Sequence, residues 1–387
     1  MARAHAVALT IAGLRVDAWD EVTVTLDMLR PGSPWTVTLW RKGRGVSWER
    51  VRAAAQVWAP VTLEVDGAVQ LRGQVERIRD AADRAGAPLT LGGRDALAAA
   101  LVSDVDPRLS LRDATLEEVM RRAIEPLGLA VTVGANADEV RAIQAGRRPG
   151  AAGRASRRQH VDRYKPKMGE KVWAFLEGLA RRHGFLLFAA PTREGTGLVV
   201  DRPAYDSAPV GTLVRRRLPS GEYEGNVLSL ALDLNAAEVP TVVTVTGHSR
   251  LGARQDARHQ ATLANDRIRT AVQRVAATFP PRPRYLRDPH ARTLQIAEQR
   301  ARRELTRAMA EFAVVEATVQ GFSTGPQASA PLWTINSMVT LDDEVTGVRG
   351  AWLVTQVTFQ RSRAGGHTTR LRLVPPGAID VEPDPEV

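Results

Sequence analysis

Short stretches in which hydrophobic and polar residues alternate occupy both ends of the chain, and the middle lacks them. Residues 22–26 and 61–65 show this period-two pattern near the N-terminus, and residues 226–230 and 241–245 show it in the second half. Side chains point alternately to the two faces of a β-strand, so the pattern predicts strands with one buried face. The chain therefore has two sets of strands to bury, separated by a segment of different character.

Residues 1–103 are predicted to form the first β domain. Asp66-Gly67 lies between two strand-like stretches, and this dipeptide tolerates the positive φ angles of a tight hairpin turn. Further strand patterns at residues 37–39, 73–79 and 88–92 bring the set to five or six strands. That number is enough to close a small barrel or sandwich.

Residues 104–205 are predicted to form a middle domain of helices and strands. Thr115 is a good helix N-cap, the apolar residues after it share one helical face, and a strand pattern follows at residues 129–133. Residues 170–188 repeat this helix–strand order, and residues 197–200 are expected to add a strand to the same small sheet.

The second β domain is predicted over residues 206–376. Within it, residues 289–312 carry a helical stripe of apolar residues. Residues 250–287 are polar and rich in Arg, and we expect them to form a basic excursion from this domain instead of a strand within it. Residues 377–387 form an acidic, proline-containing tail that we expect to be disordered. The fold class is therefore α+β, with antiparallel β-barrel or sandwich domains on either side of a helix–strand middle.

Positive charge is concentrated in two places. Residues 141–167 hold nine Lys or Arg and one Asp, and residues 250–307 hold fourteen Arg and five acidic residues. The first segment is rich in Gly and Arg and has no apolar periodicity, so we expect a mobile loop at 141–167. Local charge of this kind indicates particular basic faces or loops on a protein that is not uniformly basic.

Several classes of protein are excluded or disfavoured by what the sequence lacks. With no Cys there is no disulfide framework, thiolate metal site or cysteine nucleophile. No stretch approaches the ~18 consecutive apolar residues of a membrane span, so we expect no membrane insertion. The N-terminal residues lead into a strand pattern without the apolar core of a secretory signal, so we expect assembly in the cytoplasm.

One motif suggests catalysis. Residues 321–325 match the nucleophile elbow of hydrolases around Ser323, and Asp342 and His367 follow in the order serine, acid, histidine. The elbow requires a helix after the serine, which Pro326 and Pro331 exclude. We therefore interpret Ser323 as a hairpin-loop residue and predict no catalytic residue.

The histidines and carboxylates show no metal-ligand spacing, and no glycine-rich loop matches a phosphate-binding pattern. We predict no metal site and no cofactor. His183, near the end of its predicted helix, is interpreted as a favourable positive charge at the helix C-terminus.

The basic segments supply the candidate contacts with partners. The residues that we expect to contact a partner or line a channel are Arg147, Arg148, Arg154, Arg157, Arg158, Arg282, Arg284 and Arg287. They can neutralise phosphates or pair with an acidic protein surface, and no helix-turn-helix or zinc finger accompanies them. We favour protein partners, with a nucleic-acid-binding structural protein acting through these Arg-rich loops as the alternative.

Five of the eight tryptophans lie in the predicted first β domain, four of them between residues 35 and 58. Trp35, Trp40, Trp48 and Trp58 are candidates for interface anchors, because tryptophan is enriched there. Packing into the core is the alternative for each of them.

Four short segments, in this order, resemble the Mu-type baseplate hub family, which is related to the hubs of other contractile tails and of type VI secretion spikes. The first, residues 7–13 and 19–25, resembles the first hairpin of the family, and the second, Leu91-Gly92-Gly93-Arg94-Asp95 after the strand at 71–75, resembles the turn that closes its first barrel. The third, residues 171–202, resembles its middle helix–strand unit. The fourth resembles its last helix, strand and loop ahead of a terminal hairpin, and consists of residues 300–307, 319–322, 332–333, 336 and 365–369.

The resemblance implies a structural virion protein and no enzymatic activity. Each subunit would have two β domains with the fold of tail-tube subunits, and a homotrimer would present six such domains to the tail tube. The implied partners are a tail-tube or distal tail protein, the central spike protein, other baseplate subunits and the tape-measure protein. DNA would be transient cargo of the central channel.

Overall fold

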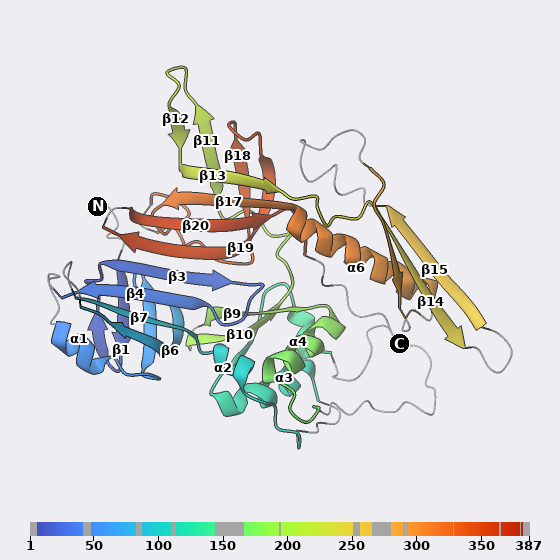
Figure 1. The fold of residues 1–387 in the computed structure, drawn as a ribbon, viewed down its shortest axis with the longest axis horizontal. Coiled ribbons are helices and arrows are strands. Elements are labelled where there is room, and N and C mark those ends of the chain that lie inside the picture. The colour runs from blue at the N-terminus through green and yellow to red at the C-terminus, as the bar shows by residue number, and fades with distance from the viewer. Residues whose placement is uncertain are drawn as a thin grey trace.

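The structure is a computed structural model of the 387-residue chain. It describes residues 6–41, 48–82, 87–109, 111, 114–143, 166–192, 195–250, 256–264, 280–288, 291, 293–327, 329–363, 365–379 and 381. A large sheet runs through the molecule, with a helical layer below it and a smaller sheet and long helix beside it in the view of Figure 1.

The N-terminal β region has the strands that the alternation predicts. Asp66 and Gly67 have φ angles of 49° and 81° and join two antiparallel strands, so the predicted hairpin turn is confirmed. One short helix, α1, was not predicted. The elements are β1 (Val7–Ile11), β2 (Leu14–Val16), β3 (Glu21–Asp27), β4 (Pro34–Trp40), α1 (Trp48–Ala54), β5 (Pro60–Val65), β6 (Ala68–Asp80) and β7 (Pro88–Asp95).

Two glycines allow β6 and β7 to approach each other closely beside a bulge between Val75 and Arg77. A Cβ atom on Gly93 would lie 2.1 Å from the carbonyl oxygen of Gln74, and one on Gly73 would lie 2.1 Å from that of Arg94. Only glycine fits these positions, because such distances are far inside van der Waals contact.

Asp95, the last residue of β7, connects the end of this strand to the β3–β4 turn. Its carboxylate accepts hydrogen bonds from the backbone N–H groups of Ser33 at 2.8 Å and Leu97 at 2.9 Å. Burial raises the pKa of Asp95, and these hydrogen bonds offset part of that rise. The Gly-Gly-Arg-Asp segment therefore closes this β region through its backbone geometry and one buried carboxylate.

The middle region contains the predicted helix–strand repeat. Thr115 caps its helix by accepting a hydrogen bond from the N–H of Glu118 at 3.2 Å. Strands β8, β10 and β9 form one three-stranded sheet, which confirms that the two units share a sheet. The elements are α2 (Ala98–Val102), α3 (Leu116–Ile124), η1 (Glu125–Leu127), β8 (Val131–Val133), η2 (Asp138–Arg141), α4 (Val172–His183), β9 (Leu186–Thr192) and β10 (Gly195–Asp201).

The interpretation of His183 as a favourable helix-end charge is wrong. The side chain is buried, its Nδ1 atom has no hydrogen-bond partner, and burial together with the positive charge of Arg182 lowers its pKa. A lowered pKa favours the neutral imidazole, so His183 serves as a packing residue of the α4 core.

The C-terminal β region is continuous with the N-terminal one. Strand β19 pairs antiparallel with β3 over seven residue pairs, from Gln356 opposite Asp27 to Ser362 opposite Glu21. The large sheet therefore contains strands from both ends of the chain. The remaining strands of this region are β11 (Thr212–Arg217), β12 (Tyr223–Gly225), β13 (Val227–Leu234), β17 (Ala313–Gln320), β18 (Ser337–Asp343), β19 (Arg349–Ser362) and β20 (Gly366–Val374).

Residues 242–312 include a second sheet that was not predicted. The segment 250–287 was expected to be a basic excursion and not a strand within the second β domain, and its strands β15 (Asp256–Ala264) and β16 (Pro283–Arg287) flank β14 (Val242–Arg250) in a three-stranded sheet separate from the large one. Helix α6 (Leu294–Phe312) packs on one face of that sheet through a small core with Val243 and Val245. Strands β15 and β16 contribute Ala261, Leu263 and Leu286 to this core, but polar residues surround these apolar ones in the sequence and hide the strand pattern.

Two boundaries also differ. The helix predicted from residue 289 begins at Leu294, where Thr293 accepts a hydrogen bond from the N–H of Ile296 at 3.3 Å. At the C-terminus, Ala378 is buried and the hydroxyl of Tyr205 bonds both the N–H and the carbonyl of Ile379. Residues 377–379 are therefore ordered against the C-terminal β region, and residues 380 and 382–387 lie outside the described part.

The α+β class is confirmed, with most of the regular structure in strands. The division at residues 1–103, 104–205, 206–376 and 377–387 stays a prediction, since β3 and β19 join the two β regions in one sheet. Of the four tryptophans, Trp35 is buried in the core, whereas Trp58 is 74% exposed.

We expect Gly93→Ala to lower the free energy of unfolding by about 2 kcal/mol or more, because overpacking against the Gln74 carbonyl has no flexible neighbour to absorb it. Gly178→Ala in α4 is the matched control, since a Cβ there meets nothing within 4 Å. Helix propensity should make that control neutral or slightly stabilising. The free energy of unfolding of each variant is measured in urea. Equal values for Gly93→Ala and Gly178→Ala would contradict the close approach of β6 and β7 at Gly93.

Candidate partner-binding surface

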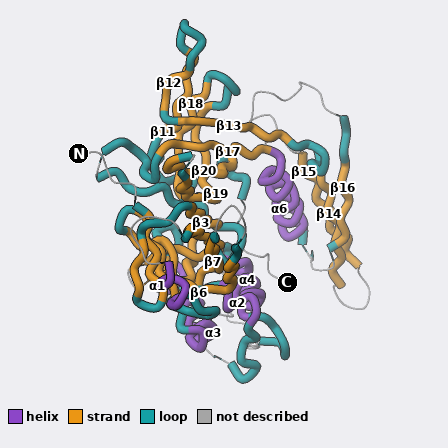
Figure 2. The backbone as a smooth tube through the Cα atoms, turned by 60° about the vertical axis from the view of Figure 1, so that its left-hand side comes forward, coloured by secondary structure: helices purple, strands orange, loops and turns teal. Residues whose placement is uncertain are grey.

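The small sheet and α6 form a unit, here called the basic module, that lies beside the large sheet (Figure 2). Val243 and Val245 of β14 are fully buried against α6, so the residues between and after them face the opposite side. Thr244 is paired with Thr262 and Tyr285, and Thr246 with Gln260 and Arg287. Together with the row of Val242, Ala264 and Pro283 at one end, these residues define the open face of the basic module. Its exposed residues are Gln260, Thr262, Ala264, Pro283, Tyr285 and Arg287, whereas Thr244 in the middle is buried between its neighbours.

Two of the three described candidate arginines are engaged within the chain. Arg284 points toward α6 and donates to Glu304 at 2.5 Å. Arg282 donates to the carbonyl oxygens of Ala236 and Ala237. Their guanidinium groups hold the module together.

Arg287 is placed differently. Its side chain is exposed, and no polar partner for it occurs among the residues that the structure describes. The other five candidates, Arg147, Arg148, Arg154, Arg157 and Arg158, lie outside the described residues. A partner contact by any of the eight arginines stays a prediction, and Arg287 is the described one that is available for it.

Tyr285 was not predicted as a site residue, although it lies on the open face and is 75% exposed. The signal was present in the alternation of Arg284 and Leu286 with Tyr285 and Arg287. Proline and arginine around it obscured the strand pattern.

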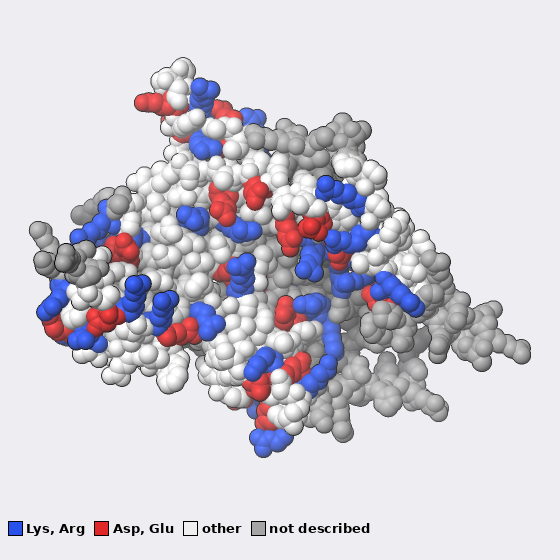
Figure 3. All heavy atoms as spheres, viewed as in Figure 1, with Lys and Arg blue, Asp and Glu red and all other residues white. Residues whose placement is uncertain are grey.

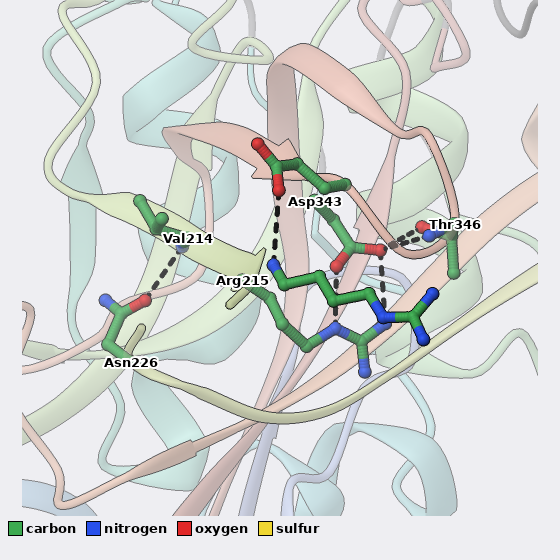
Figure 4. A network of polar contacts seen from close by, with 7 residues as sticks. Val214, Arg215, Asn226, Asp343 and Thr346 are labelled. Atoms are coloured by element: carbon green, nitrogen blue, oxygen red, sulfur yellow. Dashed lines mark hydrogen bonds and ion pairs between the residues drawn. The ribbon is translucent and has the colours of Figure 1, made fainter. Parts of the chain in front are cut away.

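A second feature is the β11–β12 hairpin, which projects from the large sheet in Figure 1. At its base Arg215 donates to both carboxylate oxygens of Asp343, at 2.6 and 3.1 Å (Figure 4). Asp343 is fully buried, and both the N–H and the hydroxyl of Thr346 donate to it as well. The carboxylate is thus satisfied by one residue of β11 and one residue of the turn after β18.

The electrostatics of Asp343 follow from these contacts. Burial acts to raise its pKa, but the hydrogen bonds from Arg215 and Thr346 together outweigh burial, and the pKa lies below its ordinary value. Asn226 completes the base of the hairpin: its side chain accepts from the N–H of Val214 at 2.8 Å and donates to the carbonyl of Thr212 at 2.7 Å. The Asn226 side chain therefore links β11 to the start of β13, two strands that form no ladder with each other.

A third feature joins the middle region to the C-terminal β region. The buried carboxylate of Asp201 accepts hydrogen bonds from Asn136 at 3.0 and 3.2 Å and from the amide of Asn336 at 3.0 Å. Asn336 has a positive φ of 54°, and its side chain also donates to the Arg202 carbonyl at 2.9 Å. This junction fixes one region against the other through polar side chains.

The hydrolase hypothesis has no geometric support. Strand β19 pairs with the strands that carry Asp342 and His367. Asp342 of β18 lies opposite Arg349 of β19, and His367 of β20 lies opposite Arg361, which is twelve positions further along β19. At the strand rise these positions are separated by roughly 40 Å, so no serine can contact both. The Ser323 hydroxyl donates to the Gly325 carbonyl at 2.9 Å, and Ser323 forms a bridge with Leu332, as expected of a loop residue.

Other site types are also without support in the described part of the chain. Its His, Asp and Glu residues form no group of three or more that could hold a metal ion. None of its helices is both long enough and apolar enough to span a membrane. On the face drawn in Figure 3, Lys and Arg are interspersed with Asp and Glu.

Comparison with known proteins adds evidence only at the level of structure. The sequence matches no protein-family model and no curated protein. The 43 kDa tail protein of prophage MuSo2 from Shewanella oneidensis is similar in structure with a TM-score of 0.74 and 19% identity, over 97% of this chain and 100% of that one. The tail protein from Neisseria meningitidis MC58 gives a TM-score of 0.72 and 20% identity, over 98% of each chain.

A more distant likeness extends beyond phages. An E. coli component of the type VI secretion system, described as similar to the bacteriophage T4 tail proteins gp27 and gp5, gives a TM-score of 0.51 and 10% identity over 95% of this chain and 76% of that one. The chain therefore has the fold of phage tail proteins over nearly its whole length. The predicted resemblance to the baseplate hub family is confirmed as a likeness of fold.

We expect Asp343→Asn to destabilise the protein by about 3 kcal/mol at neutral pH, because it leaves the guanidinium of Arg215 buried without its counter-charge. Asp342→Asn is the matched control: its carboxylate is 33% exposed and pairs with surface arginines, so it should cost under about 1 kcal/mol.

The pH dependence has a definite sign. The folded-state pKa of Asp343 is lowered, so its contribution is complete above the unfolded pKa of about 3.9 and is lost as pH falls below it. The difference in free energy of unfolding between wild type and Asp343→Asn, measured in urea, should be smaller at pH 3 than at pH 7. A gap that is constant with pH would contradict the assigned role of the carboxylate.

Proposed function

We propose that this chain is a structural subunit of a contractile-tail baseplate, a hub that forms a homotrimer and joins the tail tube to the central spike. The observation that carries the proposal is the shared fold along nearly the full length of two phage tail proteins. The tail-tube or distal tail protein, the spike, the tape-measure protein and other baseplate subunits are the proposed partners, and DNA is transient cargo. The proposed location is the virion tail, after assembly in the host cytoplasm.

The sheet edges support self-association. Strand β13 pairs with β17 on one side, and beyond the Asn226 link no described strand pairs with its other side over residues 229–234. The sequence of β13 contains no Lys, Arg or Pro, the residues that usually protect a free edge. Asp233 near its end is the one charged residue of β13, so the edge before it, over residues 229–232, is open to pairing with another chain.

The joined β regions support a ring. Because β3 and β19 hold the two regions in one sheet, each subunit would offer two β units at a fixed relative position. Three such subunits would place six units around an axis, which allows a threefold spike to meet a sixfold tube. The role requires association and shape, and no chemical step.

Light scattering after size exclusion tests the proposal. We expect three times the 42.1 kDa chain mass, alone or after co-expression with the spike protein. A strict monomer that does not bind the spike would overturn the hub role.

Ala231→Lys tests the edge of β13 separately. Ala231 is exposed, so the charge should leave the subunit folded and disfavour pairing of the edge. Thr36→Lys is the control, because Thr36 is also exposed but its strand β4 is paired on both sides. We expect a smaller mass for the first variant only, and a trimer in both would exclude β13 from the interface.

A further inference from the structure

Between residues 242 and 292 the structure describes the side chains of three arginines, of which Arg282 and Arg284 make internal contacts and Arg287 does not. Residues 242–292 contain ten Arg, no Lys and three acidic residues. Of the acids that the structure describes there, Asp288 is directed to Arg300 of α6, away from the open face. The described side chains of the open face include no carboxylate, so its charge, carried by Arg287, is positive.

The open face is supported from behind by α6. Its reverse side is packed on α6 through Val243, Val245 and Ala261, and Arg284 ties β16 to Glu304 of the same helix. The hydroxyls of Thr244 and Thr262 lie 3.1 Å apart in the middle of the face. A ligand on this surface would meet a preformed platform.

Tyr285 and Arg287 are two residues apart on the edge strand β16, so both project from the same side of the sheet. Tyr285 is 75% exposed, which leaves its ring open for stacking. Arg287 lies about 7 Å along the strand from Tyr285 by the strand rise. That spacing is close to the separation of a base from the phosphates of its neighbouring nucleotides.

The chemistry of the face distinguishes two kinds of partner. A stable protein interface is built around a cluster of buried apolar anchors. Here Tyr285 is the one aromatic residue, the apolar residues Val242, Ala264 and Pro283 lie in a single row at one end of the face, and the other residues are threonines, glutamine and arginine. An exposed aromatic ring beside an arginine, with hydroxyls around them, suits an unpaired base and its phosphate.

We propose that the open face of the basic module binds single-stranded nucleic acid, with Tyr285 stacking on a base and Arg287 neutralising a phosphate. The inference is independent of the hub role, which concerns other surfaces and is tested by mass. It is also specific to described residues, and does not depend on the Arg-rich segments that lie outside them.

Fluorescence anisotropy of a labelled oligo-dT with the full-length protein tests this, over a series of salt concentrations. Tyr285→Ala should weaken binding roughly five- to tenfold with little change in the salt dependence, since stacking is not ionic. Arg287→Gln should reduce the slope of log affinity against log salt by about 0.7, the value for one phosphate contact on a single strand. Tyr285→Phe, which keeps the ring, should bind like wild type.

Arg370→Gln is the charge-matched control, because Arg370 is exposed on β20 of the large sheet. It should change neither affinity nor slope, and thermal melts confirm that each variant is folded. Equal binding of oligo-dT and a matched duplex with no effect of Tyr285→Ala would overturn the proposal in favour of diffuse charge attraction. Absence of binding, or displacement of the oligonucleotide by poly-glutamate at equal charge, would overturn it as well.

Discussion

The pairing of β3 with β19 is the constraint on which the rest of the large sheet depends. It joins residues more than 300 positions apart through a regular antiparallel ladder, reinforced by Gln356 donating to Asp27 at 2.8 Å and by contact of the Thr25 and Thr358 hydroxyls at 3.1 Å. Side chains from both β regions belong to one hydrophobic core, which includes Val24 and Phe359. Without this ladder each region would expose a strand edge and part of that core.

The ladder also limits how the chain can fold. Closing a loop of this length costs conformational entropy before any contact repays it, so β3 and β19 are expected to pair after each β region has formed locally. The middle region is then held by the Asp201 junction, whose hydrogen bonds are directional where apolar packing is not. A buried carboxylate with several amide partners favours one relative arrangement, because any other would leave it unsatisfied.

Local chemistry made much of this fold predictable. The Asp66-Gly67 turn, the Thr115 cap and the repeated helix–strand order all depend on neighbouring residues, and the structure has them as expected. Which strands pair across the chain has no local signal, so the β3–β19 ladder was not predicted. Strands β15 and β16 were missed because polar residues surround their apolar ones, and the seven residues of α1 are too few for a clear helical period.

The candidate surface was less predictable than the fold for the same reason. The sequence identifies Arg282, Arg284 and Arg287 as one basic group, but strand alternation assigns them different environments. Arg284 faces a helix carboxylate, Arg282 bonds two carbonyl oxygens, and Arg287 faces away from both. Charge is a property of composition, whereas availability for a partner depends on the pairing of each strand. In a protein whose proposed role is contact with other chains, that pairing decides which of its many arginines can take part.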